Sequence, residues 1–454
     1  MLPLKNVPPL PDSIARMLLS LKKGKAQRAV PTNLNNSYLV KGGKVVDPAN
    51  SIFGEQDILV ENGWIIEVDD SIMPEKGVKV IDARNLLVFP GLIDMHLHLG
   101  DLFELGLKPF EEAVTDGVTL GISPGASNTF PSIGVLAAEF DRGLPMNGSC
   151  LTGAGSLIAT NASTEQLVRY FQGTMEQEEF YTCIGRNPFI YHVANLVIGI
   201  KEHLAHLFLC EEGVERAFEV TDQAKLLFMS HCQDPNYAEK VAAQANGRKL
   251  HLGHTNAAGA GTHDDGLESL NRVLELVKEP HITGEFVSSL LRPNGGCRDG
   301  LRISDLVRKR CYEALHRGEI RIVVSDGQAA SSFKGFGDSR DNVPCLLELE
   351  QEEVLTLPEA VGTMTCNVTN LLAQTTGEDW WEKELGHLGV GARANITIID
   401  PKVKRAIYTF INGSLAAFES RLIRNAFGAG GLVTKYGIFE KTGYGEFNLF
   451  SYND

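Results

Sequence analysis

Three features that would point to a membrane, to nucleic acid or to a disulfide-bonded scaffold are missing from this chain. No apolar run approaches the roughly 20 residues that a transmembrane helix needs, so we expect no membrane span. The 42 Lys and Arg are outnumbered by 57 Asp and Glu, which gives a formal net charge of −15. Phosphate contacts need a basic face, so we expect no nucleic-acid partner. The eight cysteines form no CxxC pair, which favours reduced core cysteines in a cytoplasmic protein.

What the chain does have is the composition of a folded globular protein, with 43% hydrophobic and 22% charged residues. Its 454 residues suffice for one large barrel with an appended domain, or for two to three ordinary domains. We expect residues 1–36 to be an N-terminal extension holding a short amphipathic helix, capped by Asp12 or Ser13. Its charges follow its apolar part, which is unlike a secretory signal.

Two segments near the ends of the chain have the texture of short strands and tight turns. Residues 37–89 alternate apolar and polar residues around Gly and Asn-Gly breaks, as in SYLVKGGKVVDP, which predicts a small antiparallel sheet. Residues 386–417, beginning GHLGVGARANITIID, return to this pattern and are expected to complete the same small domain. Residues 418–454 are expected to be a C-terminal tail that forms a surface wrap or a subunit contact.

Between these segments, residues 90–385 alternate apolar strands with helix-length spacers. This alternation predicts an α/β fold, a parallel (β/α)8 TIM barrel. The candidate strands are GLIDMHL, GVTLGIS, GSCLTGAG, ANLVIGIK, KLLFMSH, KLHLGHT, HITGEFV and IRIVVSD.

Several of these strands end on residues that bind metals. His96 and His98 end the first strand, and residues two apart on a strand point to the same side, here the barrel mouth where such enzymes hold their active sites. Two later strands end on His231 and His254, and the last ends on Asp326. Imidazole and carboxylate groups suit zinc and similar divalent ions. Five such residues at one rim predict a metal site.

These motifs, together with ANITIID near the end, resemble the amidohydrolase superfamily over nearly the whole chain. The resemblance implies a barrel flanked by a small β-sandwich domain built from both ends of the chain. It also implies that Lys201, which ends LVIGIK, is carboxylated by CO2 and bridges two divalent metal ions, zinc being the expected metal. A bare ammonium would be repelled by two dications, whereas a carbamate offers each an oxygen. A solvated Lys201 and direct ligation by Glu202 stay open, while alternation points His251 away from the ligand side.

The resemblance also implies which residues bind each metal ion and which residue transfers the proton. One ion would be held by His96, His98 and Asp326, the other by His231 and His254, and both by Lys201. A hydroxide shared by the ions would attack a carbonyl-like carbon, and Asp326 would act as general base and then as general acid toward the leaving nitrogen. The expected reaction is hydrolysis of a C–N bond, other than an ordinary peptide bond, in a small molecule.

The stretch ITGEFVSSLLRPNGG with EIRIVVSDGQ resembles dihydroorotases and hydantoinases, which open cyclic amides and ureides. Two positions depart from that pattern. Gly100 stands two residues beyond His98, with no arginine to hold a substrate carboxylate, and Gly327 follows Asp326 where those enzymes often have histidine. Dihydroorotase proper is therefore not expected. The candidate substrate contacts are Ser123, Asn128, Asn256 and Arg292.

Three alternatives to cyclic-amide opening stay open. The first is hydrolysis of a linear amide, as in N-acyl-amino-acid deacylases or isoaspartyl dipeptidases, and the second is a deaminase with one metal. The third, a non-catalytic scaffold, is the least expected because all six ligand positions are filled. We expect a homo-oligomer.

Overall fold

The computed structural model describes residues 37–100, 107–125, 129–202, 209–297, 300–328, 336–424 and 428–445. The expected N-terminal extension and Asn128 lie outside these ranges. Among the described helices, none has the length and apolar character needed to cross a membrane.

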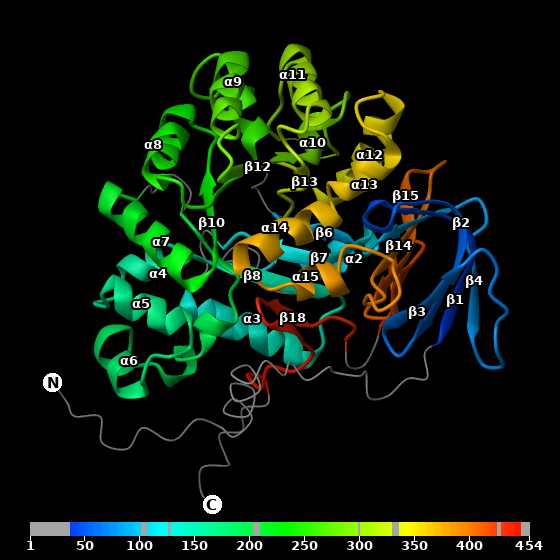
Figure 1. Cartoon of the computed structure of the whole chain (residues 1–454), viewed down its shortest axis with the longest axis horizontal. Helices are drawn as coiled ribbons and strands as arrows, with labels where there is room; N and C mark the ends of the chain where they lie inside the picture. The colour runs from blue at the N-terminus through cyan, green and yellow to red at the C-terminus, as the bar shows by residue number, and fades with distance from the viewer. Residues whose placement is uncertain are drawn as a thin grey trace, which may run out of the picture.

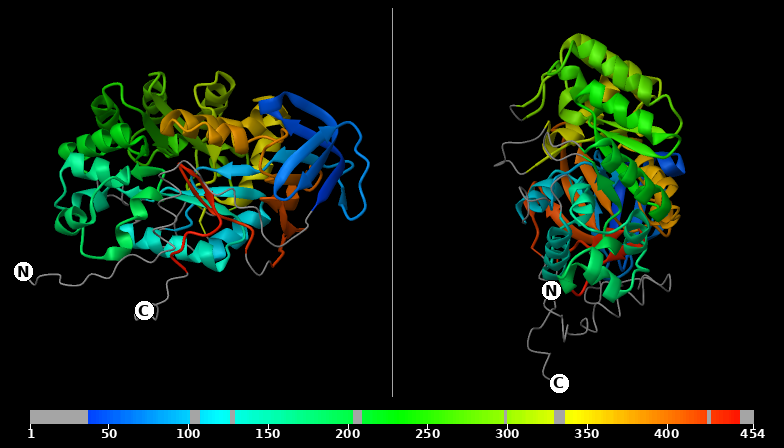
Figure 2. Two further views of the ribbon diagram at one scale, coloured as in Figure 1. Left: turned by 60° about the horizontal axis from the view of Figure 1, so that its bottom comes forward. Right: turned by 90° about the vertical axis from the view of Figure 1, so that its left-hand side faces the viewer.

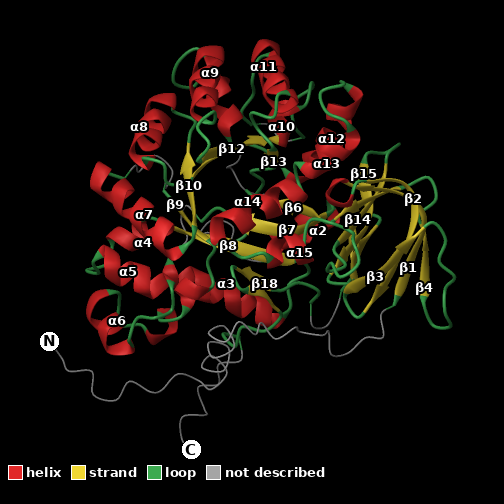
Figure 3. Ribbon diagram, in the orientation of Figure 1, coloured by secondary structure: helices red, strands yellow, loops and turns green. Residues whose placement is uncertain are grey.

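Eight parallel strands of the described residues form a barrel at the centre of the molecule (Figure 3). Each strand pairs with the next along the chain, and a parallel bridge between Leu97 and Gly327 joins the first to the last. All eight coincide with the predicted strands, so the predicted barrel is confirmed. They are β6 (Leu92–Asp94), β7 (Val118–Ser123), β8 (Asn147–Gly153), β9 (Gly199–Lys201), β10 (Leu227–His231), β11 (Leu250–Gly253), β12 (Ile282–Val287) and β13 (Ile322–Val324).

Helices surround this barrel (Figure 1). Helix α9 illustrates why they form: Asp265 caps its first backbone N–H groups, and the buried residues Leu270, Val273 and Leu274 recur at helical spacing. The helices are α2 (Lys108–Thr115), α3 (Phe130–Arg142), α4 (Gly155–Ile158), α5 (Thr164–Phe171), α6 (Gln177–Cys183), α7 (Glu211–Ala224), α8 (Pro235–Ala245), α9 (Gly266–Leu276), α10 (Ser288–Leu291), α11 (Asp305–His316), α12 (Asn342–Gln351), α13 (Leu357–Gly362), α14 (Cys366–Thr376) and α15 (Trp380–Glu384).

The small domain is a nine-stranded sheet drawn from both ends of the described chain, as predicted (Figure 2). It is mixed rather than purely antiparallel, because β1 pairs in parallel with β4 and β5. The sheet curls on itself, because Ile65 N donates to Ala392 O at 2.9 Å and thereby joins β3 to the residues before β14. It reaches β17, slightly beyond the predicted boundary at residue 417. Its strands are β1 (Tyr38–Asp47), β2 (Ile52–Glu61), β3 (Trp64–Asp69), β4 (Lys79–Asp82), β5 (Leu87–Pro90), β14 (Ile396–Asp400), β15 (Arg405–Ile411), β16 (Ser414–Phe418) and β17 (Arg421–Leu422).

Part of the expected tail belongs to the barrel. The hairpin of β18 (Leu432–Thr434) and β19 (Gly437–Phe439) pairs in parallel with the N-terminal end of β8. Val433 and Ile438 share one buried apolar cluster with inward-facing strand residues and with Trp381 of α15. The expected surface wrap is therefore wrong for this hairpin, because its apolar side chains help to close the barrel floor.

Candidate active site

The six predicted ligands lie at or just beyond the C-terminal ends of barrel strands. They are His96 and His98 after β6, Lys201 ending β9, His231 ending β10, His254 after β11 and Asp326 after β13. The strands therefore direct them to one end of the barrel, which is where barrel enzymes place their chemistry.

Three of these residues converge on one point. The Nε2 atoms of His96 and His98 lie 3.3 and 3.2 Å from Oδ1 of Asp326. One ligand atom from each residue can be chosen so that all lie within 4.8 Å of one another. Because β6 ends at Asp94, the histidines occupy an irregular segment rather than the regular strand that was predicted. Their rings still approach, with centroids 5.7 Å apart.

A buried carboxylate that the sequence reasoning missed holds this group in place. Glu285 of β12 accepts hydrogen bonds from His96 Nδ1, from His251 Nε2 at 3.0 Å and from His254 N at 3.0 Å. Burial opposes its ionisation, but the neighbouring imidazoles of His96 and His251 lower the pKa of the Glu285 carboxyl overall. An ionised carboxylate only accepts hydrogen bonds, so Nδ1 of His96 carries the proton.

The position of the His96 proton bears on whether these residues can hold a metal ion. Burial lowers the pKa of His96 despite the neighbouring carboxylates, which favours the neutral ring whose Nε2 presents a lone pair. In this tautomer the lone pair faces Oδ1 of Asp326, and the two atoms lie 3.3 Å apart. Two acceptors at this distance repel each other unless a cation lies between them. The nitrogen and oxygen donors present are those that zinc and similar ions take, so the site fits a divalent metal.

The other predicted ligands lie beside this group. The rings of His231 and His254 have centroids 4.2 Å apart, and His254 is 5.2 Å from His96. Among the described residues, Lys201 Nζ and His254 Nδ1 are buried without a hydrogen-bond partner. Burial lowers the pKa of both side chains. Burying a polar atom without a hydrogen-bond partner costs free energy. The two unpartnered atoms therefore favour a bound group at this position.

The space around Lys201 is shaped by a glycine. A Cβ atom at Gly253 would lie 2.9 Å from Lys201 Nζ and 3.2 Å from His96 Cε1. The rival ligand Glu202 is already engaged, because its carboxylate accepts hydrogen bonds from Ser230 Oγ at 2.9 Å and from the Tyr237 hydroxyl.

Backbone geometry explains why one sequence-based expectation was wrong. Alternation placed His251 away from the ligand side, but it is fully buried and donates to Glu285 inside the barrel. His254 lies past the end of β11 in the left-handed region, with φ of 42°, so counting along the strand does not apply to it. Asp326 has φ of 47°. Such strain in non-glycine residues is concentrated at functional sites.

Asp94 is a second residue that the sequence reasoning missed. Its Oδ1 accepts from the backbone N–H groups of His96 at 3.3 Å and Ser325 at 3.1 Å, and Oδ2 accepts from Asn342 Nδ2 at 2.9 Å. The residue is fully buried, and burial raises the pKa of its carboxyl to about 6. Asp94 thus ties the first strand of the barrel to the last, next to Asp326.

The described candidates for substrate contact are engaged in the fold. Ser123 Oγ accepts from Gly100 N at 3.4 Å, and the Asn256 amide bonds both backbone groups of Val287. Arg292 pairs with Asp341 and with Glu348. These contacts offer no support for a substrate role of Asn256 or Arg292.

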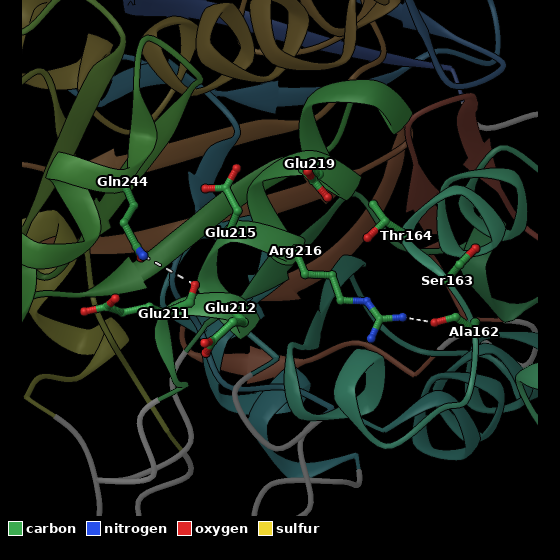
Figure 4. Close-up of a pocket in the computed structure, with 9 residues that line it drawn as sticks. All are labelled: Ala162, Ser163, Thr164, Glu211, Glu212, Glu215, Arg216, Glu219 and Gln244. Carbon is green, nitrogen blue, oxygen red and sulfur yellow. Dashed lines mark hydrogen bonds between the residues drawn. The ribbon is translucent and has the colours of Figure 1, made fainter.

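A separate pocket of about 590 Å³ lies on the outer side of the helices, lined by residues of α5, α7 and α8 (Figure 4). Arg216 points across it and donates to the backbone oxygen of Ala162. Its acidic side chains come from one helix, and Glu215 is paired with Arg248 at 2.7 Å. Acidic side chains on an outer helix are ordinarily solvated, so we assign this pocket no role in the reaction. The glutamates that line it are Glu211, Glu212, Glu215 and Glu219.

Comparison with known proteins identifies the family. Residues 87–420 match the model described as the amidohydrolase family. The chain belongs to the amidohydrolase family. The match runs from β5 through the barrel to β16, which confirms the resemblance seen in the sequence, and the family implies use of a divalent metal. This amidohydrolase is 26% identical to a dihydroorotase of Geobacter metallireducens over 410 residues, covering 81% of this chain and 90% of the relative.

Solved structures show the same fold. A dihydropyrimidinase from Brevibacillus agri superposes with a TM-score of 0.65 at 13% identity, covering 89% of this amidohydrolase and 99% of that chain. A β-aspartyl dipeptidase from Fervidobacterium islandicum gives 0.61 at 15% identity, covering 87% and 99%. Since these enzymes bear different names and share the fold, the fold does not identify the substrate.

Proposed function

We propose that this amidohydrolase opens a small cyclic amide or ureide by hydrolysing its C–N bond. The observation that carries the proposal is the pair of facing acceptors, His96 Nε2 and Asp326 Oδ1, which calls for a cation at the barrel mouth. The family and the dihydroorotase relative support this class of reaction. Gly100 narrows the range of expected substrates. It stands where an arginine would hold a substrate carboxylate, so a ring without a carboxylate is favoured.

The proposed cofactor is a pair of divalent ions, with zinc as the expected metal. When bound, such ions supply Lewis acidity to a substrate carbonyl and to water. The residues that would hold them are His96, His98, Lys201, His231, His254 and Asp326.

Lys201 is proposed to carry a carbamate. Its amine is buried, unpartnered and of lowered pKa, so the neutral form that reacts with CO2 is accessible. The ammonium first loses a proton; the neutral amine then bonds to the carbon of CO2 and releases a second proton, which leaves a carbamate with two acceptor oxygens. The missing side chain at Gly253 leaves room beside Nζ.

Asp326 is proposed to move the proton. Its Oδ2 accepts from Phe336 N at 3.4 Å, and its Oδ1 faces both histidines. The carboxylate takes a proton from the attacking water as oxygen bonds to the carbonyl carbon. It then delivers that proton to the ring nitrogen as the C–N bond breaks. The product is the open chain, heavier than the substrate by one water.

The first test is metal content per chain, measured by plasma mass spectrometry for wild type and Lys201→Ala. Both are purified without chelator and with bicarbonate present, and exposed Lys278→Ala serves as the matched control. We expect about two metals in wild type and in the control, and clearly fewer in Lys201→Ala. One metal in all three proteins would contradict the bridging lysine and favour the deaminase alternative.

The second test is a substrate screen read by mass spectrometry. Hydantoin, a dihydropyrimidine and dihydroorotate are incubated with the metal-loaded protein, together with N-acyl amino acids and β-aspartyl dipeptides. Gain of one water without fragmentation identifies ring opening, two fragments identify a linear amide hydrolase, and ammonia identifies deamination. Turnover of dihydroorotate alone would contradict the expectation drawn from Gly100. A homo-oligomeric state and a cytoplasmic location also stay predictions.

A further inference from the structure

A groove of about 560 Å³ lies between the barrel and the small domain. One wall comes from residues 402–406, at the turn joining β14 to β15. The facing wall comes from Arg292 and Cys297 after α10 and from residues 340–344 at the start of α12. The end of α2, at residues 115–116, lies beside them. The predicted ligands of the metal site are not among its lining residues.

The groove is lined mainly by basic side chains in a protein whose net charge is −15. Five basic side chains line it against one acidic side chain, Asp116. Burial raises the pKa of Asp116 to about 7, which weakens this opposing charge near neutral pH. The basic residues are Arg292, Arg340, Lys402, Lys404 and Arg405.

The two arginines of the barrel wall are held in fixed orientations. Arg292 pairs with Glu348 at 2.9 Å and with the buried Asp341, so its charge is compensated and it serves as part of the wall. Arg340 pairs with both oxygens of Asp338 through Nε at 3.0 Å and Nη2 at 2.8 Å. Within the described chain, Nη1 of Arg340 makes no hydrogen bond. A guanidinium held in this way loses little freedom when it binds an oxyanion.

The two outermost cations are uncompensated. Lys402 and Arg405 are exposed, and neither forms an ion pair with a described residue. Lys404, between them, approaches Glu348 at 3.4 Å and Gln351 at 3.0 Å. The groove therefore combines the fixed guanidinium of Arg340 with the exposed, uncompensated charges of Lys402 and Arg405.

We propose that this groove binds an organic phosphate, an ester whose phosphate contacts the basic side chains. Val343, Pro344 and Val403 supply apolar contact for the organic part. The volume lies within the range of about 300 to 1,000 Å³ typical of small-molecule sites and exceeds what an inorganic ion needs. Phosphate is the anion class that arginine forks and lysine charges bind together. This site is independent of the proposed hydrolysis.

The test uses isothermal titration calorimetry on the full-length, metal-loaded protein. The probes are adenosine monophosphate, inorganic phosphate and adenosine, which carries the ring without the charge. The variant Lys402→Glu/Arg405→Glu reverses the uncompensated charges. Lys76→Glu/Lys309→Glu makes the same charge change at exposed lysines that do not line the groove.

We expect the nucleotide to bind wild type and the control variant equally, and more tightly than inorganic phosphate or adenosine. In Lys402→Glu/Arg405→Glu its Kd should rise about tenfold or more, because two attractive charges become repulsive. Absence of nucleotide binding would overturn the proposal. An equal Kd in both variants would also overturn it, because the nucleotide would then bind elsewhere, such as at the metals. Equal affinity for inorganic phosphate and for the nucleotide would contradict a contribution of the organic part of the ligand to binding. Since binding is measured directly, failure of the hydrolysis assays leaves this test intact.

Discussion

Replacing Glu285 by glutamine should weaken metal binding while leaving the fold intact. Glu285→Gln keeps the shape of a fully buried side chain and removes its charge. The amide oxygen can still accept from His96 Nδ1 and His254 N, and the amide nitrogen then faces His251 Nε2. His251 can adapt by shifting its proton to Nδ1, which lies 2.8 Å from the hydroxyl of Thr283. The substitution therefore isolates the effect of charge on His96.

The expected magnitude follows from the hydrogen bond that loses its charge. A hydrogen bond to a charged group contributes about 1.5 to 3 kcal/mol and a neutral one about 1 kcal/mol, so the loss is about 0.5 to 2 kcal/mol. That loss corresponds to metal affinity weaker by about 2- to 30-fold. Removal of such supporting partners typically costs about 10- to 100-fold in metal affinity. We expect a loss in this range, measured by competition with a chromogenic chelator and by metal content after dialysis.

Two further variants decide whether the reasoning holds. Glu215→Gln removes a carboxylate that pairs with Arg248 near the surface, and it should leave metal affinity unchanged. Glu285→Leu removes every acceptor, so the loss should exceed that of Glu285→Gln and the unliganded protein should be less stable. Wild-type metal affinity in Glu285→Gln would refute the idea that Glu285 fixes the imidazole for metal binding.

Three other predictions follow from single contacts. Gly253→Ala places a Cβ 2.9 Å from Lys201 Nζ, so metal content should fall and activity drop about tenfold or more, while Gly54→Ala, with open space around it, should match wild type. The raised pKa of Asp116 means that its contribution to stability is complete below about pH 3.8 and is lost as pH rises through about 7. The free energy of unfolding of wild type relative to Asp116→Asn should therefore fall between about pH 4 and pH 8. The fall should be below about 4 kcal/mol, because the side chain is partly exposed. Urea titrations that show no fall would contradict this prediction. Ile438→Ala should cost about 2 to 5 kcal/mol of unfolding free energy in the same assay, and a cost below about 1 kcal/mol would contradict its place in the barrel floor.

The predictable parts of the fold are those whose signal lies within a short stretch of neighbouring residues. An apolar run that stops at His231 or Asp326 identifies both a buried strand and the polar end that it presents. Eight such runs with helix-length spacers suffice to predict the barrel, because parallel strands need crossover connections. The small domain was predictable for the same reason, from alternation and turn residues.

The supporting residues could not be predicted, because their roles depend on distant contacts. Glu285 stands alone inside the apolar run ITGEFV, and its partner His96 lies 189 residues away. Asp94 reads as one polar residue before the histidine pair, although it joins the first strand to the last. His251 was misplaced because the left-handed backbone at His254 ends the strand's alternation, and no residue type announces that turn.

Loop and tail residues were misjudged for a related reason. Arg292 reads as an unpaired cation, but it pairs with Asp341 and Glu348, which lie 49 and 56 residues further along the chain. In the tail, Val433 and Ile438 are too few to reveal a buried hairpin, since a two-stranded unit gains its stability only from what it packs against.

The position of the β18–β19 hairpin has a consequence for the order in which the protein is completed during synthesis. Chains emerge from the ribosome N-terminus first, so the eight barrel strands and all six predicted ligands are made before the hairpin. Between them the ribosome makes β14 to β17, which close the small domain begun by β1 to β5. A nascent chain that ends after β17 would thus hold every predicted ligand above a floor that still lacks Val433 and Ile438. Its apolar interior would be exposed from below, so the chain would still need protection from aggregation after every predicted ligand has been made.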